Sequence, residues 1–191
     1  TLALVGNVPH TLDVLNQALG LPTVDKQAWL AACAEKKAAW EAFKAERWAN
    51  PVLPDDYWGG EVLTQPAAIK IATDWAKGRG VPCFFDAGDV QANGFQIVED
   101  ERPDQTFTET GASYMGFAVS ALLATGVASR PFYAMALTGD GSFTMNPQIL
   151  IDGVEHGARG CILLLDNGRM SAITGLQEAQ YGAGFATWNT L

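Results

Sequence analysis

Two short apolar runs flank an amphipathic stretch in the C-terminal half of the chain. Residues 132–137 and 161–165 are continuous apolar runs, a pattern that predicts strands buried on both faces of a sheet. Residues 146–157 lie between them and have the spacing of a helix. This order predicts a βαβ unit, and its right-handed crossover makes the two strands parallel.

Polar residues follow both predicted strands. Asp140 comes soon after the first strand and Asn167 follows the second. Open α/β sheets hold ligands at the carboxyl ends of their strands, and neighbouring strands lie about 5 Å apart. A carboxylate and an amide oxygen at that separation suit a hard cation that also takes diphosphate oxygens. Ser142 stands where the following helix is expected to begin, a position that favours an anion.

The segment Gly139-Asp140-Gly141, followed after 25 residues (142–166) by Asn167, resembles the signature of thiamine diphosphate enzymes. The resemblance implies that Asp140, the Asn167 side chain and the main-chain carbonyl of Arg169 bind the Mg²⁺ that anchors the cofactor diphosphate. It also implies cofactor contacts from neighbouring positions of the two loops, namely Gly139, Gly141, Ser142, Phe143, Gly168 and Met170.

Two further stretches resemble the same family. Residues 110–117 are similar to its glycine-rich stretch, in which a large apolar residue lies beneath the bent cofactor, and Met115 matches that residue. The loop 86–91 is similar to one that supplies polar contacts to the diphosphate, and Gln91 matches such a side chain. Val90 departs from the histidine often found there, and Asp89 would repel a phosphate unless it faces away. Packing and ordinary turn chemistry are the alternatives for these positions.

Three further segments of the sequence are most similar to one branch of the family. Residues 114–120, 133–135 and 164–168 are acetohydroxyacid synthase-like and most similar to trihydroxycyclohexanedione hydrolase, a ring-opening member. The resemblance therefore implies an enzyme that makes or breaks a C–C bond next to a carbonyl, in a 2-keto acid or a 1,2-dione. A non-catalytic homologue used for assembly or regulation is the alternative.

The periodicity and the resemblance together predict an α/β fold, an open parallel sheet with helices on both faces. Residues 1–50 resemble the end of a central α/β domain, 51–62 read as a linker, and 63–191 form a thiamine diphosphate- and Mg-binding domain that is incomplete at its C-terminus. Apolar spacing predicts helices over 11–19, 25–48, 65–77 and 114–124, and strands over 2–6 and 81–85. We expect the chain to be a fragment or one subunit of a larger assembly.

Composition limits the classes of partner and the cellular compartment that we expect for this chain. A net charge of −9 argues against a nucleic-acid groove, which needs clustered Lys and Arg. No apolar run is long enough for a membrane span. The odd number of widely spaced cysteines, Cys33, Cys83 and Cys161, predicts reduced core residues in a cytoplasmic protein rather than disulfides.

No catalytic residue is predicted in this chain. The family resemblance implies that the glutamate activating the cofactor lies on a pyrimidine-binding domain, of the same or another subunit, and no glutamate here has that context. The implied partners are that domain, a small keto substrate, and further copies in a homodimer or homotetramer. The isolated chain is expected to be inactive.

Overall fold

The computed structural model describes residue 3, residues 5–20 and residues 24–189. The chain divides into two compact units, Thr1–Ala45 and Glu46–Leu191. The predicted strand over 2–6 lies partly outside the described residues, and the described residues 3, 5 and 6 are not in a strand. Among the helices that the structure describes, none has the length and apolar composition needed to cross a membrane.

The first unit is helical. Helix α1 (Val8–Leu19) begins where the Asn7 side chain accepts a hydrogen bond from the backbone N–H of His10, an N-cap that satisfies one of the free donors of the first turn. Helix α2 (Gln27–Ala49) continues into the second unit. Apolar side chains of α2, including Trp29 and Leu30, remain exposed. Both helices match the predicted stretches.

The second unit is built on a four-stranded parallel sheet in the order β4-β3-β5-β6, with β3 at Cys83–Phe85, β4 at Thr106–Thr108, β5 at Ala134–Gly139 and β6 at Gly160–Leu165. The chain runs from β3 to β4 on one side and then to β5 on the other side of β3. The strand order therefore reverses between β3 and β5, which is where open α/β sheets form their ligand crevice.

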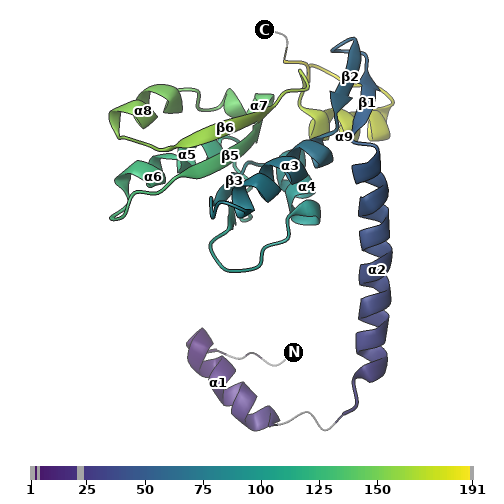
Figure 1. The fold of residues 1–191 in the computed structure, drawn as a ribbon, viewed down its shortest axis with the longest axis vertical. Helices are drawn as coiled ribbons and strands as arrows, with labels where there is room; N and C mark the ends of the chain where they lie inside the picture. The colour runs from purple at the N-terminus through teal and green to yellow at the C-terminus, as the bar shows by residue number, and fades with distance from the viewer. Residues whose placement is uncertain (1–2, 4, 21–23, 190–191) are drawn as a thin grey trace. The chain divides into compact units, whose positions relative to one another are not determined.

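Helices cover both faces of this sheet, as predicted (Figure 1). Cys83, Phe85, Met135 and Leu137 pack on one face against α3 (Gln65–Lys77) and α4 (Asp89–Ile97). The alternate strand residues, such as Phe84, pack on the other face against α5 (Phe117–Ala121) and α8 (Ile149–Glu155). The side chains alternate because successive strand residues point to opposite faces of a sheet.

Several predicted bounds need correction. The helix expected over 114–124 is two short helices, α5 and α6 (Leu123–Val127), and it starts only at Phe117 because Gly116 is left-handed, with φ +89°. The helix expected over 146–157 is the shorter α8, preceded by a separate single turn, α7 (Asp140–Phe143). Pro147 disfavours a helical conformation at Asn146 and so delays the start of α8.

Residues 51–62, predicted as a linker, include most of an antiparallel hairpin of β1 (Val52–Asp55) and β2 (Gly60–Leu63). The Asp55 carboxylate accepts hydrogen bonds from the backbone N–H groups of Tyr57 and Trp58 and so closes the turn. Helix α9 (Ser171–Tyr181) follows β6.

All three cysteines are free. Cys83 is buried, and burial raises the pKa of its thiol to about 12, so this thiol stays protonated in the core. Cys161 is half-buried, whereas Cys33 is exposed, which corrects the expectation that all three are core residues.

A substitution at Gly126 tests the close packing of α6 against the chain after α8. A Cβ added there would lie 2.3 Å from the carbonyl oxygen of His156 and 2.8 Å from the carbonyl carbon of Gly157, both backbone atoms. We expect Gly126→Ala to destabilise the fold by about 1–3 kcal/mol, because the backbone must move to admit a methyl group. Gly175, in α9, has nothing within 4 Å of its added Cβ, so Gly175→Ala is the matched control and should stabilise by roughly 0.5–1 kcal/mol. Urea unfolding measures both, and equal effects would contradict the packing.

Candidate functional site

An open pocket lies at the carboxyl ends of β3, β5 and β6. The loop after β3 contributes residues 87–90, the loop after β5 contributes residues 139–142, and the segment after β6 contributes Asn167 and residues 169–173. Met115, Gln65 and Leu165 complete the lining. The pocket therefore lies at the reversal of strand order, where the fold predicts a ligand.

Asp140 and Asn167 both line this pocket. They come from neighbouring strands, because β5 pairs with β6 and Gly139 lies opposite Leu165. The Asp140 carboxylate is half-buried, and its Oδ2 accepts a hydrogen bond from the Asn189 amide at 2.8 Å. The amide oxygen of Asn167 accepts a hydrogen bond from the Arg169 backbone N–H at 3.1 Å, and its amide nitrogen donates to the Ser171 hydroxyl. The Asn167 side chain is thus held in a fixed orientation beside the pocket.

The segment 167–170 is tied to the C-terminal end of the described chain. The Asn189 N–H donates to the Gly168 carbonyl at 2.7 Å, and the Met170 N–H donates to the Thr187 carbonyl at 2.8 Å. The Arg169 guanidinium lies 5.4 Å from the centroid of the Trp188 ring, within the range of a cation–π contact. This pairing brings the Asn189 side chain to Asp140.

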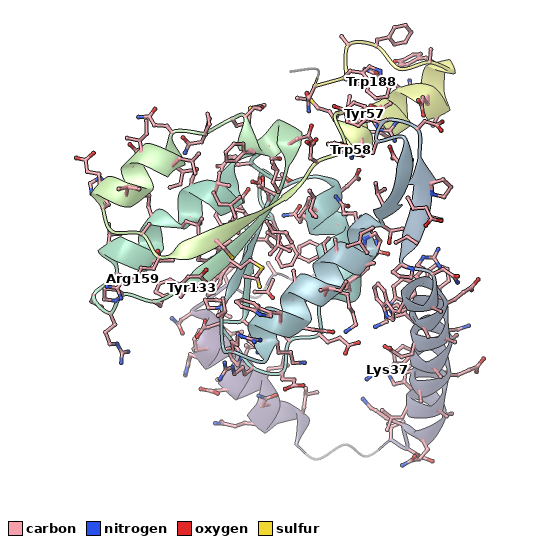
Figure 2. All side chains as sticks on the ribbon, turned by 45° about the horizontal axis from the view of Figure 1, so that its top comes forward. Lys37, Tyr57, Trp58, Tyr133, Arg159 and Trp188 are labelled. Carbon is pink, nitrogen blue, oxygen red and sulfur yellow. The ribbon has the colours of Figure 1, made fainter. Side chains whose placement is uncertain are left out.

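Tyr57, Trp58 and Trp188 form an aromatic cluster (Figure 2), and the Tyr57 ring lies against Gly168. Gly168 is buried, with φ +66°, and an added Cβ would lie 2.5 Å from Cζ of Tyr57. The structure therefore requires glycine here for two reasons, the left-handed backbone and the ring above it. Trp58 donates its indole N–H to the Asp166 carbonyl at 3.3 Å, which fixes the hairpin against the end of β6.

Gly141 lies between the two methionines of the pocket. An added Cβ would lie 3.4 Å from Cγ of Met170, 3.7 Å from Cε of Met115 and 3.2 Å from the Asn189 amide nitrogen. Gly141 is buried, so its lack of a side chain lets the two methionines and the Asn189 amide pack closely against this loop. Met115 is 40% exposed, an apolar side chain at the pocket surface rather than in the core.

Three of the predicted cofactor residues, Phe143, Gln91 and Gly168, do not line the pocket. Phe143 packs against the core on the α5 side of the sheet. Gln91 donates to the Thr108 hydroxyl at 2.6 Å and to the Glu109 carbonyl at 2.9 Å, and it accepts from the Ser113 hydroxyl at 3.1 Å. In this arrangement, Gln91 connects α4 to the end of β4 and to the segment that precedes Met115.

The remaining eight predicted site residues lie together. Gly139, Asp140, Gly141, Ser142, Asn167, Arg169, Met170 and Met115 all line the pocket, and so does Asp89. Ser142 is buried in the single-turn helix α7, not at the start of a long helix.

Sequence reasoning missed three residues of the site. Asn189 has no sequence signal, because only the return of the chain brings it to Asp140. Gln65 reaches the pocket from the start of α3. Asp86 carries a signal that could have been used, a charged residue directly after an apolar strand, where it can accept backbone hydrogen bonds.

Comparison with known proteins agrees with this geometry. Residues 86–189, more than half of the chain, match the family described as "Thiamine pyrophosphate enzyme, C-terminal TPP binding domain". Thiamine pyrophosphate is another name for thiamine diphosphate. The chain is 34% identical over 100 residues to 3D-(3,5/4)-trihydroxycyclohexane-1,2-dione hydrolase of Lacticaseibacillus casei. The aligned region covers 52% of this chain and 15% of that protein.

A second relative is the acetolactate synthase isozyme 2 large subunit of Escherichia coli, 29% identical over 119 residues, covering 62% of this chain and 22% of that protein. Among solved structures, benzoylformate decarboxylase from Polynucleobacter necessarius superimposes with a TM-score of 0.53 at 16% identity, over 65% of this chain and 25% of that chain. The chain thus spans less than a quarter of the length of these relatives.

Proposed function

Because the chain belongs to the thiamine pyrophosphate enzymes through their C-terminal TPP binding domain, we propose that the pocket at the ends of β3, β5 and β6 holds the cofactor diphosphate with Mg²⁺. The observation that carries the proposal is the meeting of Asp140 and Asn167 in one pocket, whose lining also includes the glycines on both sides of Asp140. A hard cation takes oxygen ligands, and a carboxylate and an amide oxygen supply two.

We assign the metal ligands to Asp140, the Asn167 side chain and the Arg169 main-chain carbonyl. The hydrogen bond from Asn189 occupies Oδ2 of Asp140, and within the described residues Oδ1 accepts no hydrogen bond. Asn189 therefore orients the carboxylate while leaving one oxygen to a cation, the usual arrangement of an outer partner around a metal ligand. The bond from the Arg169 N–H fixes the Asn167 amide oxygen, which has a second lone pair for the metal.

The remaining pocket residues suit the other parts of the cofactor. Gly139, Gly141 and Ser142 present backbone close to the diphosphate, and the apolar walls of Met115 and Met170 suit the rings. We propose that the exposed Met115 supports the bend between the two rings, and that Gly168 keeps its loop in the required conformation. Gln91 and Phe143 lie behind this surface and support it.

When bound, the cofactor would supply a thiazolium ring, whose carbon can add to a carbonyl group and which can take up the electron pair of the bond that breaks. The residues of this chain hold the diphosphate, orient the metal ligands and exclude water from the Met115 side. We propose that the complete enzyme makes or breaks a C–C bond next to a carbonyl of a 2-keto acid or 1,2-dione. The similarity to a dione hydrolase and to acetolactate synthases supports this class.

We also propose that residues 1–50 belong to a preceding domain and 63–191 to the cofactor domain. The division of the chain near residue 45 supports this boundary. The exposed Met115 supports a further proposal, that a pyrimidine-binding domain of the same or another subunit closes the pocket in a homodimer or homotetramer. The three free cysteines support a reducing, cytoplasmic compartment.

Asp140→Ala tests the metal assignment. We expect this variant to abolish Mg²⁺-dependent binding of thiamine diphosphate, because it removes a charged ligand, while the fold stays intact. Asp89→Ala is the matched control, since Asp89 is the other carboxylate of the pocket lining. It should preserve or strengthen binding, because it removes a charge that repels the diphosphate. Calorimetric titration with the cofactor in MgCl₂ measures both, and wild-type affinity in Asp140→Ala would reject the assignment.

Met115 tests the apolar wall. Met115→Ala should weaken thiamine diphosphate binding by about tenfold, because burying a side chain of this size contributes about 1.5–3 kcal/mol. Met115→Leu should stay within about threefold of the wild type, since it keeps most of the bulk. Both variants should unfold near the wild-type urea concentration, because Met115 is already 40% exposed. Equal cofactor affinity in the two variants would contradict a supporting role.

The isolated 191-residue chain should not activate the cofactor. Of the described residues that line the pocket, the acidic ones are Asp89 and Asp140, and none is a glutamate. We therefore expect the thiazolium C2 proton to exchange at the rate of free cofactor, as followed by NMR in deuterated buffer. Exchange well above that rate would show that this chain contains the activating acid.

A further inference from the structure

A fully buried carboxylate lies behind the cofactor pocket. Asp86 follows β3 directly and is 0% exposed. Its backbone N–H donates to the Leu137 carbonyl at 3.0 Å, which extends the pairing of β3 with β5 by one residue. A buried charge costs several kcal/mol unless hydrogen bonds satisfy it, so the groups that face Asp86 define what it does.

Three donors surround the Asp86 carboxylate. Its Oδ1 accepts from the backbone N–H of Ala87 at 2.9 Å and from that of Gly116 at 2.8 Å. Its Oδ2 accepts from the Thr138 hydroxyl at 2.8 Å. Bonds to an ionised acceptor are stronger than neutral ones, and these three join the end of β3, the end of β5 and the turn that precedes α5.

Each of the three segments leads directly into the pocket. Ala87 lines it, Thr138 stands two residues before Asp140, and Gly116 follows Met115. The sheet holds Thr138 through the pairing of β5 with β6, but the turn at Met115 and Gly116 lies outside any strand. The bond from the Gly116 N–H to Asp86 is therefore a direct link between that turn and the sheet edge.

The turn has little freedom for any other arrangement. Gly116 is buried with φ +89°, and an added Cβ would lie 3.2 Å from Cβ of Met145 and 3.5 Å from the Ser142 carbonyl oxygen. The turn thus packs closely on the chain that follows Asp140. Its position relative to that loop sets the width of the pocket between Met115 and Gly141.

We propose that Asp86 is the positioning residue of the cofactor site, the group that holds the Met115 turn at the correct distance from the Asp140 loop. This inference rests on the proposed function, since it assumes that the cofactor lies between those two walls. Asp86 acts through Gly116 and Thr138, and it does not touch the cofactor.

The geometry offers a conservative variant that keeps the bonds and removes the charge. In Asp86→Asn, the amide oxygen can still accept from Ala87 and Gly116, and the amide nitrogen can donate to the Thr138 hydroxyl. The hydroxyl proton can then turn to the Gly139 carbonyl, 3.3 Å away. Asp86→Ala removes every bond, and Thr138→Val removes only the bond from β5. Comparing the three variants distinguishes an effect on the position of the turn from an effect on the stability of the whole fold.

The first measurement is hydrogen exchange at single amides in the chain without cofactor. We expect Asp86→Ala to accelerate exchange of the Gly116 N–H at least tenfold relative to the amides of β5, because this N–H loses its acceptor. Asp86→Asn and Thr138→Val should keep the Gly116 amide protected to within about threefold. If Asp86→Ala does not fold, Thr138→Val and Asp86→Asn still decide the matter, since fast exchange at Gly116 in Asp86→Asn would overturn the proposal.

The second measurement compares two ligands in the presence of Mg²⁺, thiamine diphosphate and inorganic pyrophosphate. Asp86→Ala should weaken thiamine diphosphate about tenfold and pyrophosphate less than threefold, because the ring wall moves while the diphosphate loop stays on β5. Asp86→Asn should restore both affinities. Equal weakening of the two ligands, or none, would overturn the positioning role. If the wild-type chain binds neither ligand, the proposed function fails, and the exchange of the Gly116 amide still decides whether Asp86 holds the turn.

Discussion

The pairing register of β3, β5 and β6 is the constraint on which the rest of the site depends. Gly139 lies opposite Leu165, so the loops after β5 and β6 leave the sheet at the same level, and Phe85 lies opposite Leu137, so the loop after β3 leaves two residues earlier. A shift of one residue in the register would move every side chain of the shifted strand to the opposite face of the sheet. Phe85 or Leu137 would then no longer pack in its present core. The apolar core on both faces therefore fixes the register, and the register places Asp140 beside Asn167.

A second layer of contacts orients the groups that the sheet brings together. Asp86 joins the turn at Gly116 to both central strands, and Asn189 holds one oxygen of Asp140. Neither contact lies within one element of secondary structure. The sheet alone would place these loops within a few ångströms, whereas a metal and a diphosphate need ligands at defined distances.

The aromatic cluster also brings together residues that lie far apart in the sequence. Tyr57 and Trp58 belong to the hairpin that precedes the sheet domain, and Trp188 belongs to its last described segment. Tyr57 contacts both tryptophans, and its ring packs on Gly168, whose backbone is left-handed just after β6. A glycine that looks like part of a flexible loop in the sequence is in fact packed under a ring.

The sequence by itself determined the parallel α/β architecture, the strand ends at which Asp140 and Asn167 stand, and the apolar character of Met115. Continuous apolar runs and helical spacing are local signals, and a spacing of 25 residues allows one crossover helix between neighbouring strands. Only the tertiary structure decided that residues 52–63 pair as a hairpin, that Gln91 bonds to Thr108 rather than lining the pocket, and that Asn189 reaches Asp140 across 49 positions. These contacts depend on where distant segments pack, and no periodicity within a segment encodes the partner it will meet.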